Sequence, residues 1–206
     1  MKPAAFAAVV LLLSAALYFI AHRGPEVTPL HPDESILAFG DSITYGFGAD
    51  EHQSYPAVLQ SMTGLRVINA GINGETSEEG LARLPKLLED DSIRLMLLCF
   101  GGNDILQQRS HERLKHNLKR MIDLAKAKEI DVVLIGVPTF GILGLSSLPL
   151  YGELAEKEKV AYMPSLLPDV LGDPALKNDY IHPNAAGYRY MAEQIDERLR
   201  GLGYLD

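Results

Sequence analysis

The sequence predicts an α/β fold in which a parallel β-sheet is covered by helices on both faces. Short apolar runs alternate along the chain with longer segments that have the hydrophobic period of amphipathic helices. The apolar runs do not alternate with polar residues, which is typical of strands buried on both faces of a parallel sheet. Residues 35–206 have the length of one domain with a sizeable core.

The expected elements follow one another in a regular order. Four apolar runs and a weaker fifth one are expected to be strands, at residues 35–39, 66–70, 94–100, 131–137 and 160–164. Five amphipathic segments are expected to be helices, near residues 54–63, 76–90, 110–129, 148–159 and 184–201. The alternation of the two types predicts one open parallel sheet that is covered on both faces.

The first residues differ from the rest of the chain. An uninterrupted apolar stretch at residues 3–21 follows Lys2 and precedes His22 and Arg23. Its length lies between that of a signal-peptide core and a membrane span of about 20 residues. We expect residues 1–22 to be an uncleaved membrane anchor, with a cleaved signal as the alternative, and residues 23–34 to be a proline-containing tether.

Composition excludes some functions. The formal net charge is -8 and no dense cluster of Lys and Arg occurs, so nucleic acid is not an expected partner. The single cysteine, Cys99, lies in an apolar run and is expected to be a buried hydrophobic residue. With one thiol there is no intrachain disulfide.

Polar and glycine-rich sequences follow the first three expected strands, at residues 40–42, 71–74 and 101–104. The carboxyl ends of parallel strands meet at one edge of a sheet, where ligands bind. A fourth polar sequence, at residues 179–184, precedes the last helix and contains a histidine. The sequence therefore predicts one site at this edge.

Three residues of these sequences suit nucleophilic catalysis. A serine hydroxyl needs an adjacent base, and the base needs a third group to orient it. Ser42, His182 and Asp179 fit these roles, since the Asp-x-x-His spacing lets one loop present both side chains. Taken singly, each residue is equally typical of an ordinary turn, a surface loop or the entry to a helix, for which Asn184 is a suitable N-cap.

Acyl transfer also needs hydrogen-bond donors that face the developing oxyanion. Gly74 can bring its backbone N–H close to a substrate because it has no side chain, and Asn103 carries an amide donor. The backbone N–H of Ser42 is a third candidate. Thr76 and Glu79 have the spacing of a capping box, which is compatible with a catalytic role for Gly74.

Four of these segments carry a family resemblance. FGDSITYG, GINGETS, GGND and DYIHPN occur in the order and at about the intervals of the signature blocks of the SGNH hydrolases, also called the GDSL lipase/esterase family. Over about residues 35–200 the chain most resembles the small bacterial arylesterase, acyl-CoA thioesterase and lysophospholipase group.

This resemblance implies a flavodoxin-like, three-layer αβα sandwich with about five parallel strands. It implies Ser42 as the nucleophile, Gly74 and Asn103 as oxyanion donors, and Asp179 with His182 as the rest of the triad. It implies no metal and no cofactor. The usual export of the family leads us to expect a periplasmic or other extracytoplasmic location.

The substrate is less well defined by the resemblance. Ile43 replaces the leucine of the GDSL motif, a change of similar size. Residues 137–152 are more apolar than in the group that the chain resembles, and we expect residues 140–150 to border the cleft. Candidate acyl-site residues are Ile105, Leu106, Phe140, Ile142 and Leu143, with Leu145 nearby.

The leading prediction is therefore a serine hydrolase that cleaves the ester or thioester bond of a small acyl ester or lipid. A carbohydrate O-deacetylase is the alternative enzyme, and the apolar segment at residues 137–152 argues against it. A flavodoxin-like module that binds a ligand without turnover is the alternative from another class. A binding module needs neither a base nor a group that orients the base, so the presence of His182 and Asp179 argues against it.

Overall fold

The structure is a computed structural model that describes residues 27–141 and 144–206, without the side chain of Phe140. The strands of the main sheet are β1 (Ser35–Gly40), β2 (Arg66–Gly71), β3 (Ile93–Cys99), β4 (Asp131–Ile135) and β7 (Ala161–Met163). Five helices coincide with the expected amphipathic segments: α3 (Tyr55–Thr63), α4 (Ser77–Leu87), α6 (His111–Lys126), α7 (Pro149–Glu158) and α9 (Ala185–Leu202).

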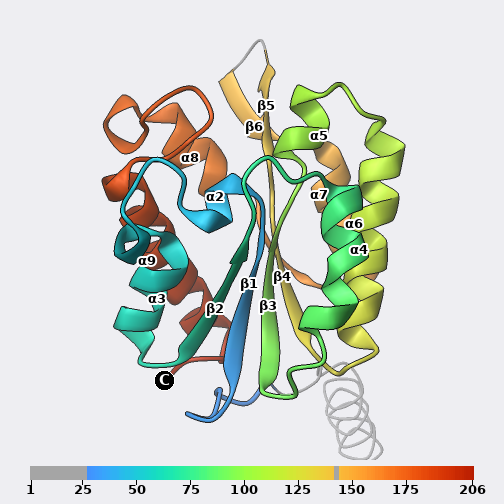
Figure 1. Ribbon diagram of the computed structural model, residues 1–206, viewed down its shortest axis with the longest axis vertical. Coiled ribbons are helices and arrows are strands. Elements are labelled where there is room, and N and C mark those ends of the chain that lie inside the picture. The colour runs from blue at the N-terminus through green and yellow to red at the C-terminus, as the bar shows by residue number, and fades with distance from the viewer. Residues whose placement is uncertain (1–26, 142–143) are drawn as a thin grey trace, which may run out of the picture.

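The main sheet has the strand order β2-β1-β3-β4-β7, and every pair in it is parallel. β1 lies between β2 and β3, and all of its residues are buried. In Figure 1, α3 and α9 lie on one side of the sheet, and α4, α6 and α7 lie on the other. The expected three-layer αβα sandwich is confirmed.

The sequence did not predict several shorter elements. The segments after β1 and β3 were expected to be loops, but each forms a short helix, α2 (Ser42–Tyr45) and α5 (Gly102–Leu106). The apolar segment after β4 contains an antiparallel hairpin of β5 (Pro138–Gly141) and β6 (Gly144–Ser147). A further helix, α8 (Leu166–Gly172), and two short 3₁₀ helices, η1 (Glu51–Gln53) and η2 (Pro174–Leu176), complete the described elements.

The carboxyl end of β2 packs directly against α2. A Cβ atom on Gly71 would lie 2.0 Å from the backbone nitrogen of Tyr45, so only glycine permits this contact. Side chains also satisfy backbone groups of β2, which is an edge strand. The Val67 N–H donates to the side-chain oxygen of Gln60 at 3.0 Å, and the Gly71 N–H donates to that of Asn69 at 3.0 Å.

The expected anchor and the first four residues of the tether, residues 1–26, lie outside the described residues. Across the described ranges, no helix combines the length and apolar character that crossing a bilayer requires.

Candidate active site

Ser42, His182 and Asp179 form a chain of hydrogen bonds at the carboxyl edge of the sheet. Ser42 is the first residue of α2, and His182 lies shortly before α9. Ser42 Oγ is 3.1 Å from His182 Nε2, and His182 Nδ1 is 2.9 Å from Asp179 Oδ2. The structure thus brings together side chains that are 140 residues apart in the sequence.

Asp179 determines which imidazole nitrogen faces the serine. Partial burial raises the pKa of the Asp179 carboxyl, but the hydrogen bond from His182 and those from the Ile181 and His182 backbone N–H groups outweigh this effect. The pKa is therefore below its ordinary value, and the carboxylate is an acceptor. Nδ1 of His182 must then carry the hydrogen, which leaves the Nε2 lone pair for the Ser42 hydroxyl.

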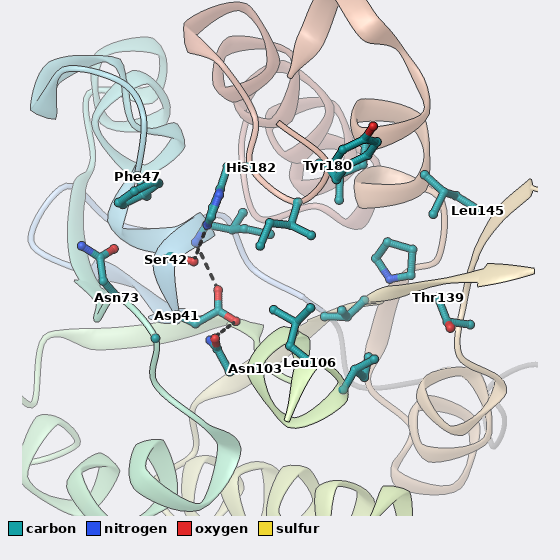
Figure 2. Close-up of a pocket in the computed structure, with 18 residues that line it drawn as sticks. Asp41, Ser42, Phe47, Asn73, Asn103, Leu106, Thr139, Leu145, Tyr180 and His182 are labelled. Carbon is teal, nitrogen blue, oxygen red and sulfur yellow. Dashed lines mark hydrogen bonds between the residues drawn. The ribbon is translucent and has the colours of Figure 1, made fainter. Parts of the chain in front are cut away.

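Contacts with the segment after α2 hold the histidine loop beside Ser42. The Asn178 side-chain amide donates to the carbonyl of Gly48 at 2.7 Å. The Phe47 ring packs on the imidazole of His182, with 4.6 Å between ring centroids, as Figure 2 shows. The Tyr188 hydroxyl, from α9, donates to the Phe47 carbonyl at 2.9 Å. These contacts join the two loops independently of the Ser42–His182 hydrogen bond.

The three expected oxyanion donors, Ser42, Gly74 and Asn103, line the same cavity as His182. Gly74 has a φ of +77°, in the left-handed region that favours glycine. The Asn103 side-chain amide donates to the Glu75 carbonyl at 3.0 Å and makes a longer contact of 3.4 Å with Asp41 Oδ2. The bond to Glu75 orients the amide, and the N–H that makes the longer contact is the one available to an oxyanion.

Asp41 is a buried carboxyl group directly before the serine, and only 3% of its surface is exposed. It caps α2, because its Oδ1 accepts from the Ile43 N–H at 3.1 Å. Burial, helped by the nearby carboxyl groups of Asp104 and Glu75, raises the pKa of Asp41 to about 7 against the lowering effect of the hydrogen bond from the Ile43 N–H. Asp41 is thus largely protonated below neutral pH.

The cavity beside Ser42 has a volume of about 300 Å³ and is mainly apolar. Two of the five expected acyl-site residues, Ile105 and Leu106, line it, as does Leu145. Of the other three, Ile142 and Leu143 lie outside the described residues, as does the side chain of Phe140 in β5. In Figure 2, Leu145 and Tyr180 lie on the side of the cavity opposite Asn73.

Sequence reasoning missed several residues of the cavity. These are Phe47, Asn73, Val137, Pro138, Thr139, Leu171, Tyr180 and Ile181. Tyr180 and Ile181 lie between Asp179 and His182, so the Asp-x-x-His spacing already implied that they border the site. No comparable signal marked Leu171, because α8 was not expected. Asp41 had no predicted role of its own, although its place directly before the serine was a usable signal.

Other chemistries have less support in the described part of the chain. Burial raises the pKa of the Cys99 thiol well above its ordinary value, as expected of a residue that packs as a hydrophobic group. Within residues 27–141 and 144–206, no group of three or more His, Cys, Asp or Glu side chains is placed to hold a metal ion.

A serine, a histidine and a carboxylate joined by hydrogen bonds at this edge of a parallel sheet are the arrangement of a serine hydrolase. The profile of the GDSL-like lipase/acylhydrolase family matches residues 38–190. The chain belongs to the GDSL-like lipase/acylhydrolase family and is a serine esterase of that family. The expected family is confirmed, and the alternative of a binding module without turnover is set aside.

Individual relatives agree with this assignment. The chain is 34% identical to esterase TesA of Pseudomonas aeruginosa over 202 residues, which covers 93% of this chain and 98% of that protein. It is 30% identical to thioesterase 1/protease 1/lysophospholipase L1 of Escherichia coli, covering 82% of this chain and 85% of that protein. A crystal structure of TesA, 34% identical, matches the fold with a TM-score of 0.73 over 82% of this chain and 99% of that one.

The raised pKa of Asp41 predicts a dependence of stability on pH. Between the ordinary carboxyl pKa of 3.8 and about 7, the folded chain holds a proton on Asp41 that the unfolded chain has lost. The Asp41 proton therefore adds fully to the free energy of unfolding below pH 3.8. This contribution is lost as the pH rises from there through about 7. In Asp41→Asn, which keeps the cap and cannot ionise, the loss is absent.

Urea unfolding of both proteins between about pH 4 and pH 8 tests this linkage. The stability of Asp41→Asn relative to wild type should increase with pH up to about pH 7 and then level off. Other titrating groups cancel in the difference, since both proteins share them. Parallel stability profiles would contradict a raised pKa for Asp41.

Proposed function

We propose that this chain hydrolyses acyl esters or thioesters through an acyl-enzyme formed on Ser42. The observation that carries the proposal is the chain of hydrogen bonds that joins the side chains of Ser42, His182 and Asp179 beside an apolar cavity. His182 is the general base and Asp179 orients it. The relatives named esterase and thioesterase support both bond types as substrates.

The reaction has two half-reactions. His182 Nε2 takes the hydroxyl proton as Ser42 Oγ attacks the carbonyl carbon, and the carbonyl oxygen becomes negative. The resulting imidazolium gives its proton to the leaving alcohol or thiol, and the acyl group remains on Ser42. Water then attacks the acyl-enzyme by the same route, with His182 as the base, and releases the acid.

The backbone N–H groups of Ser42 and Gly74 and the amide of Asn103 stabilise the negative oxygen. All three residues border the space beside Ser42 Oγ. The protonated form of Asp41 also suits this site, because a neutral carboxyl group places no charge beside the developing oxyanion.

The substrate class follows from the cavity. Its apolar lining suits the hydrocarbon chain of an acyl group, and Ile105, Leu106 and Leu145 contribute to it from two elements. Phe140, Ile142 and Leu143 remain candidate acyl-site residues in this proposal because of the apolar character of their sequence. A carbohydrate deacetylase has no use for a cavity of this size and polarity.

We also propose that residues 3–21 export the chain and anchor it in a membrane, with residues 23–34 as a tether and residues 35–206 as the catalytic domain. The uninterrupted apolar character of residues 3–21 supports this division.

Removal of the triad should abolish activity. Ser42→Ala and His182→Ala should fold and lose p-nitrophenyl esterase activity, whereas Asp179→Ala should retain more because it takes no proton. Asn103→Ala should lower kcat by roughly a hundredfold with little change in KM, since oxyanion donors act in the transition state. A fluorophosphonate probe should label wild type and not Ser42→Ala. Turnover by folded Ser42→Ala would refute the assignment.

The acyl cavity predicts a preference for longer chains. Each buried methylene contributes up to about 0.8 kcal/mol, so octanoyl esters should have a clearly higher kcat/KM than acetyl esters. Leu145→Ala should lower kcat/KM for the octanoyl ester by about tenfold through lost contact area and leave the acetyl ester unchanged. Met62→Ala, on α3 and outside the cavity, is the control. A preference for acetate would favour the deacetylase instead.

The location predicts a simple fractionation result. The full-length chain should sediment with membranes and be accessible to protease from outside the cytoplasm, while a variant that lacks residues 1–22 should remain in the soluble fraction. N-terminal sequencing of the mature chain distinguishes an anchor from a cleaved signal. Recovery of the full-length chain in the cytoplasm would contradict the proposal.

A further inference from the structure

A largely buried ion pair lies beneath the loop that carries Gly74. Arg83, from α4, makes two hydrogen bonds to the carboxylate of Glu75, Nε to Oε1 at 2.6 Å and Nη2 to Oε2 at 2.5 Å. The Glu75 side chain is 7% exposed and that of Arg83 is 23% exposed. The other described Arg–carboxylate pairs lie nearer the surface, so this pair carries an unusual cost of desolvation.

The same guanidinium group contacts both β1 and the neighbouring edge strand β2. Arg83 Nη2 donates to the carbonyl of Ala70 in β2 at 2.8 Å and makes a longer contact of 3.4 Å with the carbonyl of Gly40 in β1. Its carbon lies 4.6 Å from the centroid of the Phe39 ring. One side chain thus joins the ends of β1 and β2 to the loop that follows β2.

Glu75 is connected to two of the three proposed oxyanion donors, Gly74 and Asn103. It directly follows Gly74, and its backbone carbonyl accepts the Asn103 amide at 3.0 Å. A shift of Glu75 therefore moves both the Gly74 backbone and the partner that orients Asn103. The Glu75 N–H also donates a weak hydrogen bond to the Ile72 carbonyl at 3.3 Å, which is one further restraint on the loop.

We propose that Arg83 is a positioning residue for the oxyanion hole, and that it acts by holding Glu75 so that Gly74 and Asn103 face one point. This inference rests on the proposed roles of Gly74 and Asn103. Because the paired charges largely cancel, the pair acts through geometry. A small misplacement of oxyanion donors affects the transition state more than the bound ester, so the loss should appear in kcat.

Three variants separate geometry from charge. Arg83→Gln leaves a negative carboxylate near the oxyanion, Glu75→Gln leaves a positive guanidinium group, and the double variant leaves neither. If the pair positions the loop, all three should lower kcat by about tenfold or more with KM within about twofold. Arg200→Gln, which breaks an exposed bidentate pair with Asp196 on α9, should keep the wild-type kcat.

A double-mutant cycle with Asn103→Ala completes the test. If Arg83 acts through Asn103, Arg83→Gln should cost much less in the Asn103→Ala background than in wild type. Where Arg83→Gln fails to fold, Arg83→Lys serves in the same cycle, because an ammonium group cannot make both hydrogen bonds. Thermal unfolding reports the folded state of each variant.

If Asn103→Ala is impaired, the oxyanion-hole assignment stands, and the following results would overturn only the role proposed for Arg83. These are a wild-type kcat in Glu75→Gln and the double variant, or an equal cost of Arg83→Gln in both backgrounds. A defect confined to KM would also overturn it. Full activity of Asn103→Ala would instead overturn the oxyanion-hole assignment, and this inference with it.

Discussion

The close packing of α2 on the ends of β1 and β2 is the contact on which the site depends. A Cβ atom on Gly40 would lie 2.2 Å from Thr44 Oγ1 and 2.5 Å from the Cys99 carbonyl, and one on Gly71 would meet the Tyr45 backbone. Because these two positions have no side chains, the first turn of α2 packs directly on the ends of β1 and β2. Ser42 is thereby presented at the edge of the sheet by rigid, buried backbone.

Three buried carboxyl groups surround this contact, and each is accommodated differently. Glu75 is paired with Arg83, whereas Asp104 accepts from the N–H and hydroxyl of Ser77 at 2.8 Å and 2.7 Å. Asp41 has weaker partners, and its raised pKa reflects this. In the described part of the chain no buried side-chain nitrogen or oxygen atom lacks a hydrogen-bond partner. The polar network below the site is therefore complete, which limits the movement of the residues above it.

The sequence was sufficient to predict the main sheet, the five principal helices and the meeting of Ser42 with His182. These features depend on hydrophobic period and on the rule that parallel strands end at one edge. Asn184 was also correctly expected to cap α9, as its bond from the Gly187 N–H shows. Short elements such as α8 were missed because long-range packing decides them. The pKa of Asp41 depends on burial among distant residues, which no local pattern encodes.

The hydrogen bonds that Gln60 of α3 and Asn69 of β2 accept from the backbone of β2 have a consequence for association between copies of this chain. An exposed edge strand offers free N–H groups to any other strand, and through such pairing two sheets join edge to edge. Here the N–H groups of Val67 and Gly71 are already occupied by side-chain oxygens of the same molecule. A second molecule would have to displace both before it added a sixth strand, so this edge resists the growth of continuous intermolecular sheets.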